Sequence, residues 1–294
     1  MTASSMTGIA LDHVAHAVPA WQDAWPRYAG QLGAEWSSGG DSIGFSPAQL
    51  RFANGARIEL LKPNDTESND FLARYLQRSG PGPHHLTFKV PDLQAAIAAA
   101  RQAGFDPIGV DLSDPEWKEA FIHPKQATGI VVQLAEAPGV GWSSPAPDGF
   151  PTERRRRRDG SGAVRPASLQ RVTHAVADLD AGIDLFGRLL GGAVEDRGTR
   201  PGEEWIDFRW GGPLAVRLIA PTDGPESGEL SAWLGDRTGR VHHLLLADEE
   251  PDTLIDAHPA DPGLPGLGGS RRGHEPWIVE PENNLGLRLV AAAL

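Results

Sequence analysis

Cysteine is absent from the 294 residues, so disulfides, thiolate metal ligands and cysteine nucleophiles are all excluded. A metal ion in this protein must therefore be bound by histidine, carboxylate, amide or water. No run of about 18 apolar residues is present, which argues against a membrane-spanning helix. Residues 1–8 lack the basic and apolar regions of a secretory signal, so we expect a cytoplasmic protein without a membrane partner.

Positive charge is scarce, with 27 Lys and Arg against 39 Asp and Glu and a net charge of -12. Nucleic-acid binding needs a basic face, so this composition argues against nucleic acid as a partner. One unbroken arginine run, at 154–158, lies in a segment rich in Pro, Gly and Ser. We interpret residues 137–167 as an interdomain linker whose arginines either attract the acidic domains or bind an acidic partner.

The chain repeats itself at an offset of 158 residues. Residues 11–18 (LDHVAHAV) match residues 169–176 (LQRVTHAV), and the same offset carries the His-His pair at 84–85 onto 242–243. Near the end the offset slips to 155, where 132–134 meets 287–289. A register held this long predicts two duplicated domains, which we place at 8–136 and 168–292.

A fainter repeat lies inside the first domain, where residues 13–19 resemble residues 85–91. A helix-like stretch follows each copy. The clearer one, at 92–104, has Asp92 as a plausible N-cap and Gly104 at its end. Short apolar runs at 57–61 and 130–134 then predict strands. Each quarter of the chain is therefore predicted to be a strand, a helix and several strands, which gives an α+β fold.

Several motifs occur in a characteristic order: Asp-His-Val at His13, Ile-Glu-Leu-Leu-Lys-Pro at Glu59, Pro-His-His-Leu-Thr-Phe at His85, and His-Pro-Lys before the strand that contains Gln133. In this order they resemble the vicinal-oxygen-chelate superfamily, and the first domain is most similar to methylmalonyl-CoA epimerase and glyoxalase I. The resemblance covers 8–136 well and 168–292 weakly. It implies two tandem domains, each a pair of βαβββ units that form a cupped mixed sheet.

The same resemblance implies a divalent metal ion bound by His13, Glu59, His85 and Gln133. Side chains alternate along a strand, so we expect His16 to point away from His13, and His84 away from His85. Imidazole and carboxylate ligands suit zinc, nickel, cobalt, manganese or iron(II).

The predicted site departs from its relatives at Gln133. In the epimerase and glyoxalase I a carboxylate stands at this position and takes part in proton transfer, which an amide cannot do. Glu59 is therefore the candidate catalytic base. The epimerase also uses a second glutamate in the strand before Glu59, but residues 42–52 contain no acid after Asp41, which argues against epimerase activity specifically.

The second domain has lost this ligand set, because Arg171, Arg217, His243 and Arg288 stand at the corresponding positions. Three cations cannot bind a divalent metal ion, since ligands need lone pairs. Two alternatives follow. The arginines pair with neighbouring acids such as Glu203, Glu204, Asp207 or Glu280, or they form an anion pocket for a carboxylate or phosphate.

Three functions are compatible with these features. The first is a metal-dependent lyase or isomerase acting on a small carbonyl or acyl substrate. The second is a non-haem iron(II) dioxygenase, because two histidines and one carboxylate are its usual ligands. The third is a small-molecule (antibiotic) binding protein whose cleft is lined by tryptophans such as Trp21, Trp25, Trp36 and Trp117. The complete ligand set favours an enzyme, either a monomer whose tandem domains pair internally or a homodimer.

Overall fold

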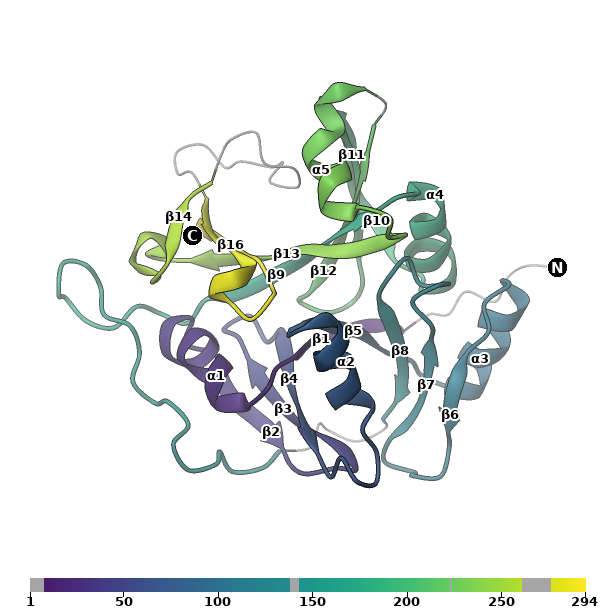
Figure 1. Ribbon diagram of the computed structural model, residues 1–294, viewed down its shortest axis with the longest axis horizontal. Coiled ribbons are helices and arrows are strands. Elements are labelled where there is room, and N and C mark those ends of the chain that lie inside the picture. Colours follow the sequence, from purple (N-terminus) through teal and green to yellow (C-terminus); the bar gives the residue numbers. More distant parts are fainter. Residues whose placement is uncertain (1–7, 138–142, 223, 261–275) are drawn as a thin grey trace. The chain divides into compact units, whose positions relative to one another are not determined.

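The computed structural model describes residues 8–137, 143–222, 224–260 and 276–294. The start of the chain at 1–7 and the predicted linker residues 138–142 lie outside the described residues, as do 223 and 261–275 of the predicted second domain. Within these limits the chain forms two mixed eight-stranded sheets with few helices (Figure 1).

The first sheet has the strand order β2-β3-β4-β1-β5-β8-β7-β6. Its strands are β1 (Ala10–Ala17), β2 (Glu35–Gly39), β3 (Gly44–Arg51), β4 (Arg57–Asn64), β5 (Gly82–Lys89), β6 (Ile108–Asp111), β7 (Lys118–Ile122) and β8 (Val131–Glu136). The helices between them are α1 (Trp21–Trp25), the π-helix η1 (Pro26–Gln31), α2 (Phe71–Ser79) and α3 (Leu93–Gln102).

The second sheet repeats this order as β10-β11-β12-β9-β13-β16-β15-β14. Its strands are β9 (Ser168–Val176), β10 (Ala193–Arg200), β11 (Glu203–Arg209), β12 (Ala215–Pro221), β13 (Gly239–Asp248), β14 (Ala257–Pro259), β15 (Trp277–Val279) and β16 (Leu289–Ala293). The helices are α4 (Leu179–Gly182), η2 (Ile183–Leu189), η3 (Pro225–Ser227), α5 (Gly228–Leu234), η4 (Pro251–Thr253) and η5 (Pro281–Asn283). We call β1–β4, β5–β8, β9–β12 and β13–β16 modules 1 to 4.

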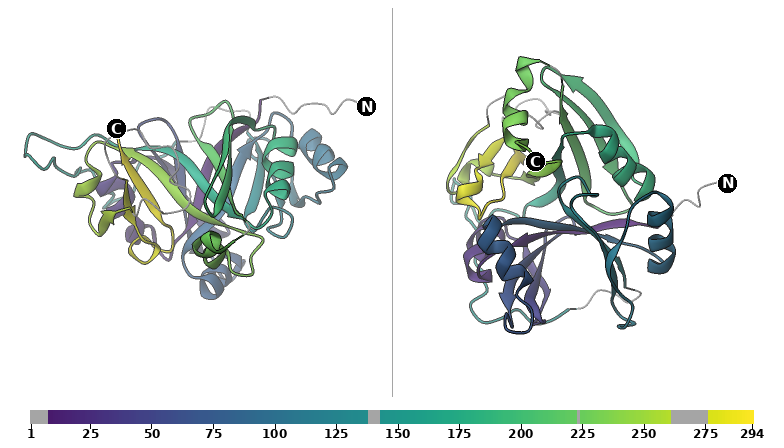
Figure 2. Two further views of the ribbon diagram at one scale, coloured as in Figure 1. Left: turned by 90° about the horizontal axis from the view of Figure 1, so that it is seen from above. Right: turned by 45° about the vertical axis from the view of Figure 1, so that its right-hand side comes forward.

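The predicted α+β fold with two tandem mixed sheets is confirmed. Strands β5 and β8 pair in parallel, whereas β7 and β8 pair antiparallel. The predicted helix at 92–104 is α3, where the Asp92 side chain accepts the Ala95 N–H and Gly104 has a φ of 88°. The sequence did not predict α2, which lies between modules 1 and 2. Figures 1 and 2 show α3 beside β7 and β8.

The chain forms two compact units whose boundaries differ from those of the predicted domains. One unit comprises residues 1–13, 85–141 and 171–242, and the other comprises 14–84, 142–170 and 243–294. Each unit therefore combines most of one module from the first sheet with most of one from the second. The boundaries at 8–136, 137–167 and 168–292 stay a prediction.

In the first unit, modules 2 and 3 pack through aromatic residues. The ring of Phe88 on β5 lies 5.0 Å from that of Trp210 and 6.2 Å from that of Phe186. His174 on β9 reaches into module 2, where its Nε2 lies 2.8 Å from the backbone oxygen of Thr128. Since side chains alternate along β5, Phe88 points away from the face that carries Thr87.

In the second unit, modules 1 and 4 make the corresponding contacts. His16 Nε2 lies 2.8 Å from the backbone oxygen of Leu285, and Asn284 donates a hydrogen bond of 3.1 Å to the Tyr28 hydroxyl. On the opposite face of module 1, α2 packs over Ala15 and Leu61. Alternation places Glu59 on the same face as Leu61, so α2 covers part of the face that carries Glu59.

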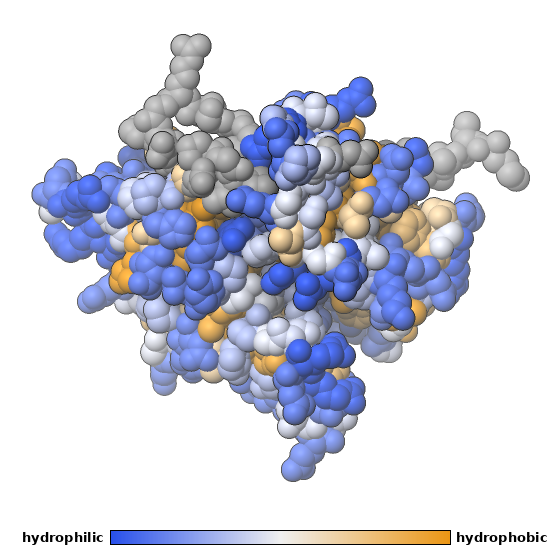
Figure 3. Space-filling view, turned by 45° about the horizontal axis from the view of Figure 1, so that its top comes forward, coloured by the Kyte–Doolittle hydropathy of each residue, from blue (hydrophilic) through white to orange (hydrophobic). Residues whose placement is uncertain are grey.

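No helix in the part of the chain that the structure describes is long and apolar enough to cross a membrane. The face drawn in Figure 3 is mainly hydrophilic, with hydrophobic residues in small separate groups.

Candidate metal centre

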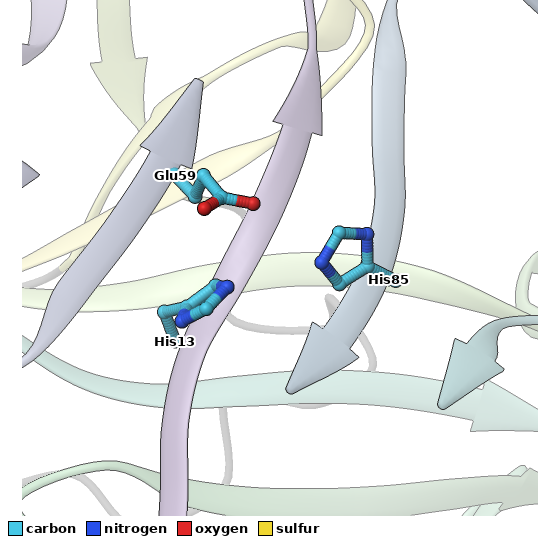
Figure 4. Close-up of side chains that lie close together, drawn as sticks. All are labelled: His13, Glu59 and His85. Atoms are coloured by element: carbon cyan, nitrogen blue, oxygen red, sulfur yellow. The ribbon is translucent and has the colours of Figure 1, made fainter. Parts of the chain in front are cut away.

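Three of the predicted ligands lie together. His13 on β1, Glu59 on β4 and His85 on β5 each offer a ligand atom, and these atoms all lie within 4.8 Å of one another. Figure 4 shows the three side chains pointing toward one another from neighbouring strands. The two imidazole rings are 5.8 Å apart and meet edge to face. All three residues are at most 8% exposed, so the cluster is withdrawn from bulk water.

The orientation of His13 suits a metal ligand. Its Nδ1 lies 2.8 Å from Asp12 Oδ2, and because a carboxylate accepts hydrogen bonds, the imidazole proton belongs on Nδ1. Nε2 then carries a lone pair. This nitrogen lies 2.9 Å from the Thr87 hydroxyl oxygen. A carboxylate on the outer nitrogen of a histidine ligand is a recurrent feature of metal sites.

The Glu59 carboxylate has a neutral neighbour on the adjacent strand. Gln49 on β3 stands directly opposite Glu59 in the antiparallel pairing, and its Nε2 donates a hydrogen bond of 3.3 Å to Glu59 Oε1. Arg57 Nη1 in turn donates to Gln49 Oε1 at 3.3 Å. Because Gln49 carries no charge, this contact orients the carboxylate without adding a positive charge.

Gln133 on β8, the fourth predicted ligand, takes part in a hydrogen-bonded network with its neighbours. Its Oε1 accepts a bond of 2.6 Å from the Thr87 hydroxyl, the same hydroxyl that contacts His13. Its Nε2 donates to Glu119 Oε2 at 2.7 Å, and Trp117 Nε1 donates to that same oxygen at 2.8 Å. Gln133 is 6% exposed. Both ends of its buried carboxamide are hydrogen-bonded, to partners that are themselves buried or half-buried.

The sequence did not single out Asp12, Gln49, Thr87 or Glu119. Asp12 could have been found, since it directly precedes His13 in the Asp-His-Val motif. Gln49 and Glu119 lie on the strands next to those of Glu59 and Gln133. Locating them needs the cross-strand register, which the sequence alone does not provide.

The two neighbouring histidines make other contacts, and His16 points away from His13 as strand alternation predicts. His16 is fully buried, with Nδ1 2.9 Å from the Tyr28 hydroxyl, and burial lowers its pKa to about 4. The ring of His84 lies 4.8 Å from that of Tyr75 on α2. Burial likewise lowers the pKa of His84 to about 4, while the nearby charge of Glu59 acts in the opposite direction. Both imidazoles are therefore neutral near pH 7.

The donor set fits a divalent metal ion. Two imidazole nitrogens and a carboxylate oxygen converge. Among the described residues, this is the group of His, Asp and Glu side chains close enough together to hold one metal ion. Histidine and carboxylate are usual ligands of zinc and of the neighbouring first-row metals. The carboxamide oxygen of Gln133 adds a fourth donor of compatible chemistry.

The corresponding positions of the second sheet contain ion pairs. Arg217 on β12 binds Asp207 through Nε and Nη2, both at 2.6 Å, and Arg171 Nη1 lies 3.2 Å from the same carboxylate. Arg288 Nη2 lies 2.9 Å from Glu280. These contacts are those of the first alternative, in which the arginines pair with neighbouring acids.

The anion pocket stays a prediction. His243 on β13 is fully buried, and the pKa of Arg171 is lowered to about 10 by burial and by the neighbouring Arg217. Two guanidinium groups and one carboxylate, on Arg171, Arg217 and Asp207, leave an excess of positive charge. A divalent cation is therefore disfavoured there.

Comparison with known proteins identifies related sequences. The family model of the Glyoxalase/Bleomycin resistance protein/Dioxygenase superfamily matches residues 12–121. An ethylmalonyl-CoA/methylmalonyl-CoA epimerase from Cereibacter sphaeroides is 31% identical over 134 residues, which cover 43% of this chain and 96% of that protein. The mitochondrial methylmalonyl-CoA epimerase of Homo sapiens is 30% identical over 132 residues, which cover 43% of this chain and 73% of that protein.

Some solved structures resemble nearly the whole chain. A mutant of 4-hydroxymandelate synthase from Streptomyces coelicolor superposes with a TM-score of 0.62 at 15% identity, over 97% of this chain and 93% of that one. At this identity the likeness concerns the fold. It shows that both sheets together follow a known tandem architecture.

Proposed function

Since the chain belongs to the glyoxalase/bleomycin resistance protein/dioxygenase superfamily, we propose that it is a divalent-metal-dependent lyase or isomerase acting on a small carbonyl or acyl substrate. The observation that carries this proposal is the convergence of His13, Glu59 and His85 within 4.8 Å. Gln133 completes the proposed ligand set. The two curated relatives are named as epimerases of ethylmalonyl-CoA or methylmalonyl-CoA, which supports a reaction at the carbon beside a carbonyl group.

A divalent ion bound there would supply Lewis-acid stabilisation of negative charge on the substrate oxygens. Glu59 is the proposed base that removes the proton from the adjacent carbon. Its carboxylate accepts a hydrogen bond of 3.3 Å from the amide of Gln49, and a carboxylate oxygen can accept a proton. The burial of the cluster excludes bulk water and strengthens the electrostatic interactions.

A second candidate is an iron(II)-dependent oxygenase. Two histidines and one carboxylate form the usual ligand set of such enzymes, and His13, His85 and Glu59 have this composition. Iron in the purified protein together with oxygen consumption would favour this candidate over the first.

Metal analysis of protein purified without chelators or a nickel column tests both candidates. We expect about one ion per chain in the wild type and none in His85→Ala. The matched control is His84→Gln, at the adjacent residue whose ring packs against Tyr75, and it should retain the ion. A wild type that takes up neither zinc, nickel, cobalt, manganese nor iron(II) would overturn the proposed function.

Proton exchange tests the reaction type. Incubation of the metal-loaded protein with methylmalonyl-CoA or ethylmalonyl-CoA in deuterium oxide should incorporate deuterium beside the thioester carbonyl. Glu59→Gln should slow this exchange by roughly 10²–10⁴-fold, the usual contribution of a general base. Metal occupancy is measured on both proteins, so that loss of the ion is distinguished from loss of the base. Exchange at an equal rate in a fully occupied variant would contradict the role of Glu59.

A further inference from the structure

We propose that Glu119 is a positioning residue of the metal centre, which holds the Gln133 carboxamide so that its oxygen serves as the metal ligand. The proposal rests on the proposed function, because it concerns the same metal centre. Glu119 lies on β7, the strand that pairs antiparallel with β8, on which Gln133 lies.

The Gln133 carboxamide has one hydrogen-bond partner at its NH₂ group and one at its oxygen. A carboxylate only accepts hydrogen bonds, so Glu119 Oε2 at 2.7 Å must face the NH₂ group. The Thr87 hydroxyl donates a hydrogen bond of 2.6 Å to the oxygen. Because a hydroxyl can also accept, the contact with Glu119 is the one that sets the orientation. The oxygen therefore lies beside the hydroxyl that also contacts His13 Nε2.

Glu119 is itself held in place. Trp117 Nε1 donates a bond of 2.8 Å to the oxygen that accepts from Gln133. The chain of contacts thus runs from Trp117 through Glu119, Gln133 and Thr87 to His13. Without Glu119 the NH₂ group would lose its acceptor, and a rotation of about 180° would place it where the metal ion requires a lone pair.

Each side of the metal centre contains one carboxylate and one amide that are hydrogen-bonded to each other, but the proposed ligand and its support are exchanged between the two sides. In module 1 the ligand is the carboxylate of Glu59 and the amide of Gln49 supports it at 3.3 Å. In module 2 the ligand is the amide of Gln133 and the carboxylate of Glu119 supports it at 2.7 Å. Each pair therefore supplies one negative charge. Glu119 polarises the amide group, so that Gln133 Oε1 binds a metal ion more strongly. Carboxylates have the same effect on histidine ligands.

The affinity for Co²⁺ and Zn²⁺, measured by calorimetry on the metal-free 294-residue chain, tests this role. Glu119→Gln should weaken binding by roughly 10–100-fold, as is usual when the hydrogen-bond partner of a ligand is lost. It should also shift the visible spectrum of the Co²⁺ form, because the donor atom at Gln133 changes. The matched control is Glu136→Gln on β8, whose carboxylate binds Lys118 and the Leu93 N–H. Its metal affinity should equal that of the wild type.

A reciprocal exchange separates positioning from simple stability. In the double variant E119Q/Q133E the donor and acceptor are exchanged, so the hydrogen bond re-forms and a carboxylate becomes the ligand. We expect its metal affinity to return to within about threefold of the wild type or to exceed it, while Q133A alone stays weak. The melting temperatures of the metal-free variants are recorded in parallel, so that a general loss of stability is recognised.

The outcomes distinguish the two proposals. If the wild type binds no metal ion, the proposed function and this inference both fail. If the wild type binds one but E119Q binds it as tightly, only the role of Glu119 is wrong. A double variant as weak as either single variant would likewise overturn the positioning role.

Discussion

Histidine serves two purposes in this protein, and the alternation of strand faces separates them. On β1, His13 lies in the metal cluster, whereas His16 points to the other face and contacts the backbone of Leu285. His174 makes the corresponding contact with the backbone of Thr128. Burial lowers the pKa of both His16 and His174 to about 4. These two residues pair modules and have no part in the proposed chemistry.

Their lowered pKa values predict a pH-dependent stability. At pH values above 6.5, the pKa of these histidines in the unfolded chain, they are neutral in both the folded and the unfolded state. The folded protein then has its full stability. As the pH falls from 6.5 toward 4, the unfolded chain binds protons that the folded one excludes, and stability is lost. Between pH 7.5 and 5 we expect a loss on the order of 2 kcal/mol per histidine, measured by urea unfolding.

The variant H16Q/H174Q should lose less stability than the wild type over this pH range, because a glutamine cannot be protonated. The control is His123→Gln, since His123 is exposed, and it should follow the wild type. An equally steep loss in the double variant would rule out these histidines as its source.

At the scale of elements, the predicted linker is bound to the residues at the end of β13, although its Pro, Gly and Ser content is typical of a flexible segment. Its arginine run pairs with the acidic end of β13 and the residues that follow. Arg155 Nη2 binds both carboxylate oxygens of Asp248 at 2.6 and 2.7 Å, and Arg158 lies 2.6 Å from Asp252. Arg157 contacts Glu249 as well. The expectation that the arginines attract acidic residues is met, although Arg155 is buried rather than solvated.

Removal of Arg155 should destabilise the protein strongly. Its side chain is 8% exposed and that of Asp248 is fully buried. Arg155→Met would leave the carboxylate without this partner, at a cost of about 3–5 kcal/mol in the free energy of unfolding. Arg154→Met removes an exposed pair with Glu35 and should cost at most about 1 kcal/mol. Equal urea midpoints for the two variants would show that the buried pair does not stabilise the linker.

For the molecule as a whole, modules from different sheets pack together within each compact unit. In the first unit the backbone at the turn before β8 touches the start of β13, where Gly129 meets Gly239. In the second unit the turn before β16 touches the chain before β5, where Gly286 meets Pro81. The same contact thus occurs in both units. The internal pairing of the tandem domains and the choice between monomer and homodimer stay predictions.

These close approaches leave no room for a side chain. A Cβ atom at Gly239 would lie 2.0 Å from the Thr128 backbone oxygen. Gly239→Ala should therefore cost an amount at or above the upper end of the roughly 1–3 kcal/mol usual for overpacking. The control is Gly228→Ala on α5, where nothing lies within 4 Å, and stability should be unchanged or slightly raised. Matching thermal unfolding curves for the two variants would contradict the close packing.

The repeated sheet, the α+β class and the convergence of His13, Glu59 and His85 can all be predicted from the sequence. These features depend on local patterns: the 158-residue repeat, the alternation along strands, and the motifs around His13, Glu59 and His85. Strand alternation is also enough to separate His13 from His16, because it needs only the residue spacing.

The side chains that support the ligands, and the modules that pack together, emerge only from the folded chain. Glu119 and Gln133 are 14 residues apart, and they meet because β7 and β8 pair in one particular register. The pairing of module 2 with module 3 depends on contacts such as Phe88 with Trp210, whose partners are far apart in the chain. Such contacts depend on register and packing between distant segments, for which no short-range pattern exists.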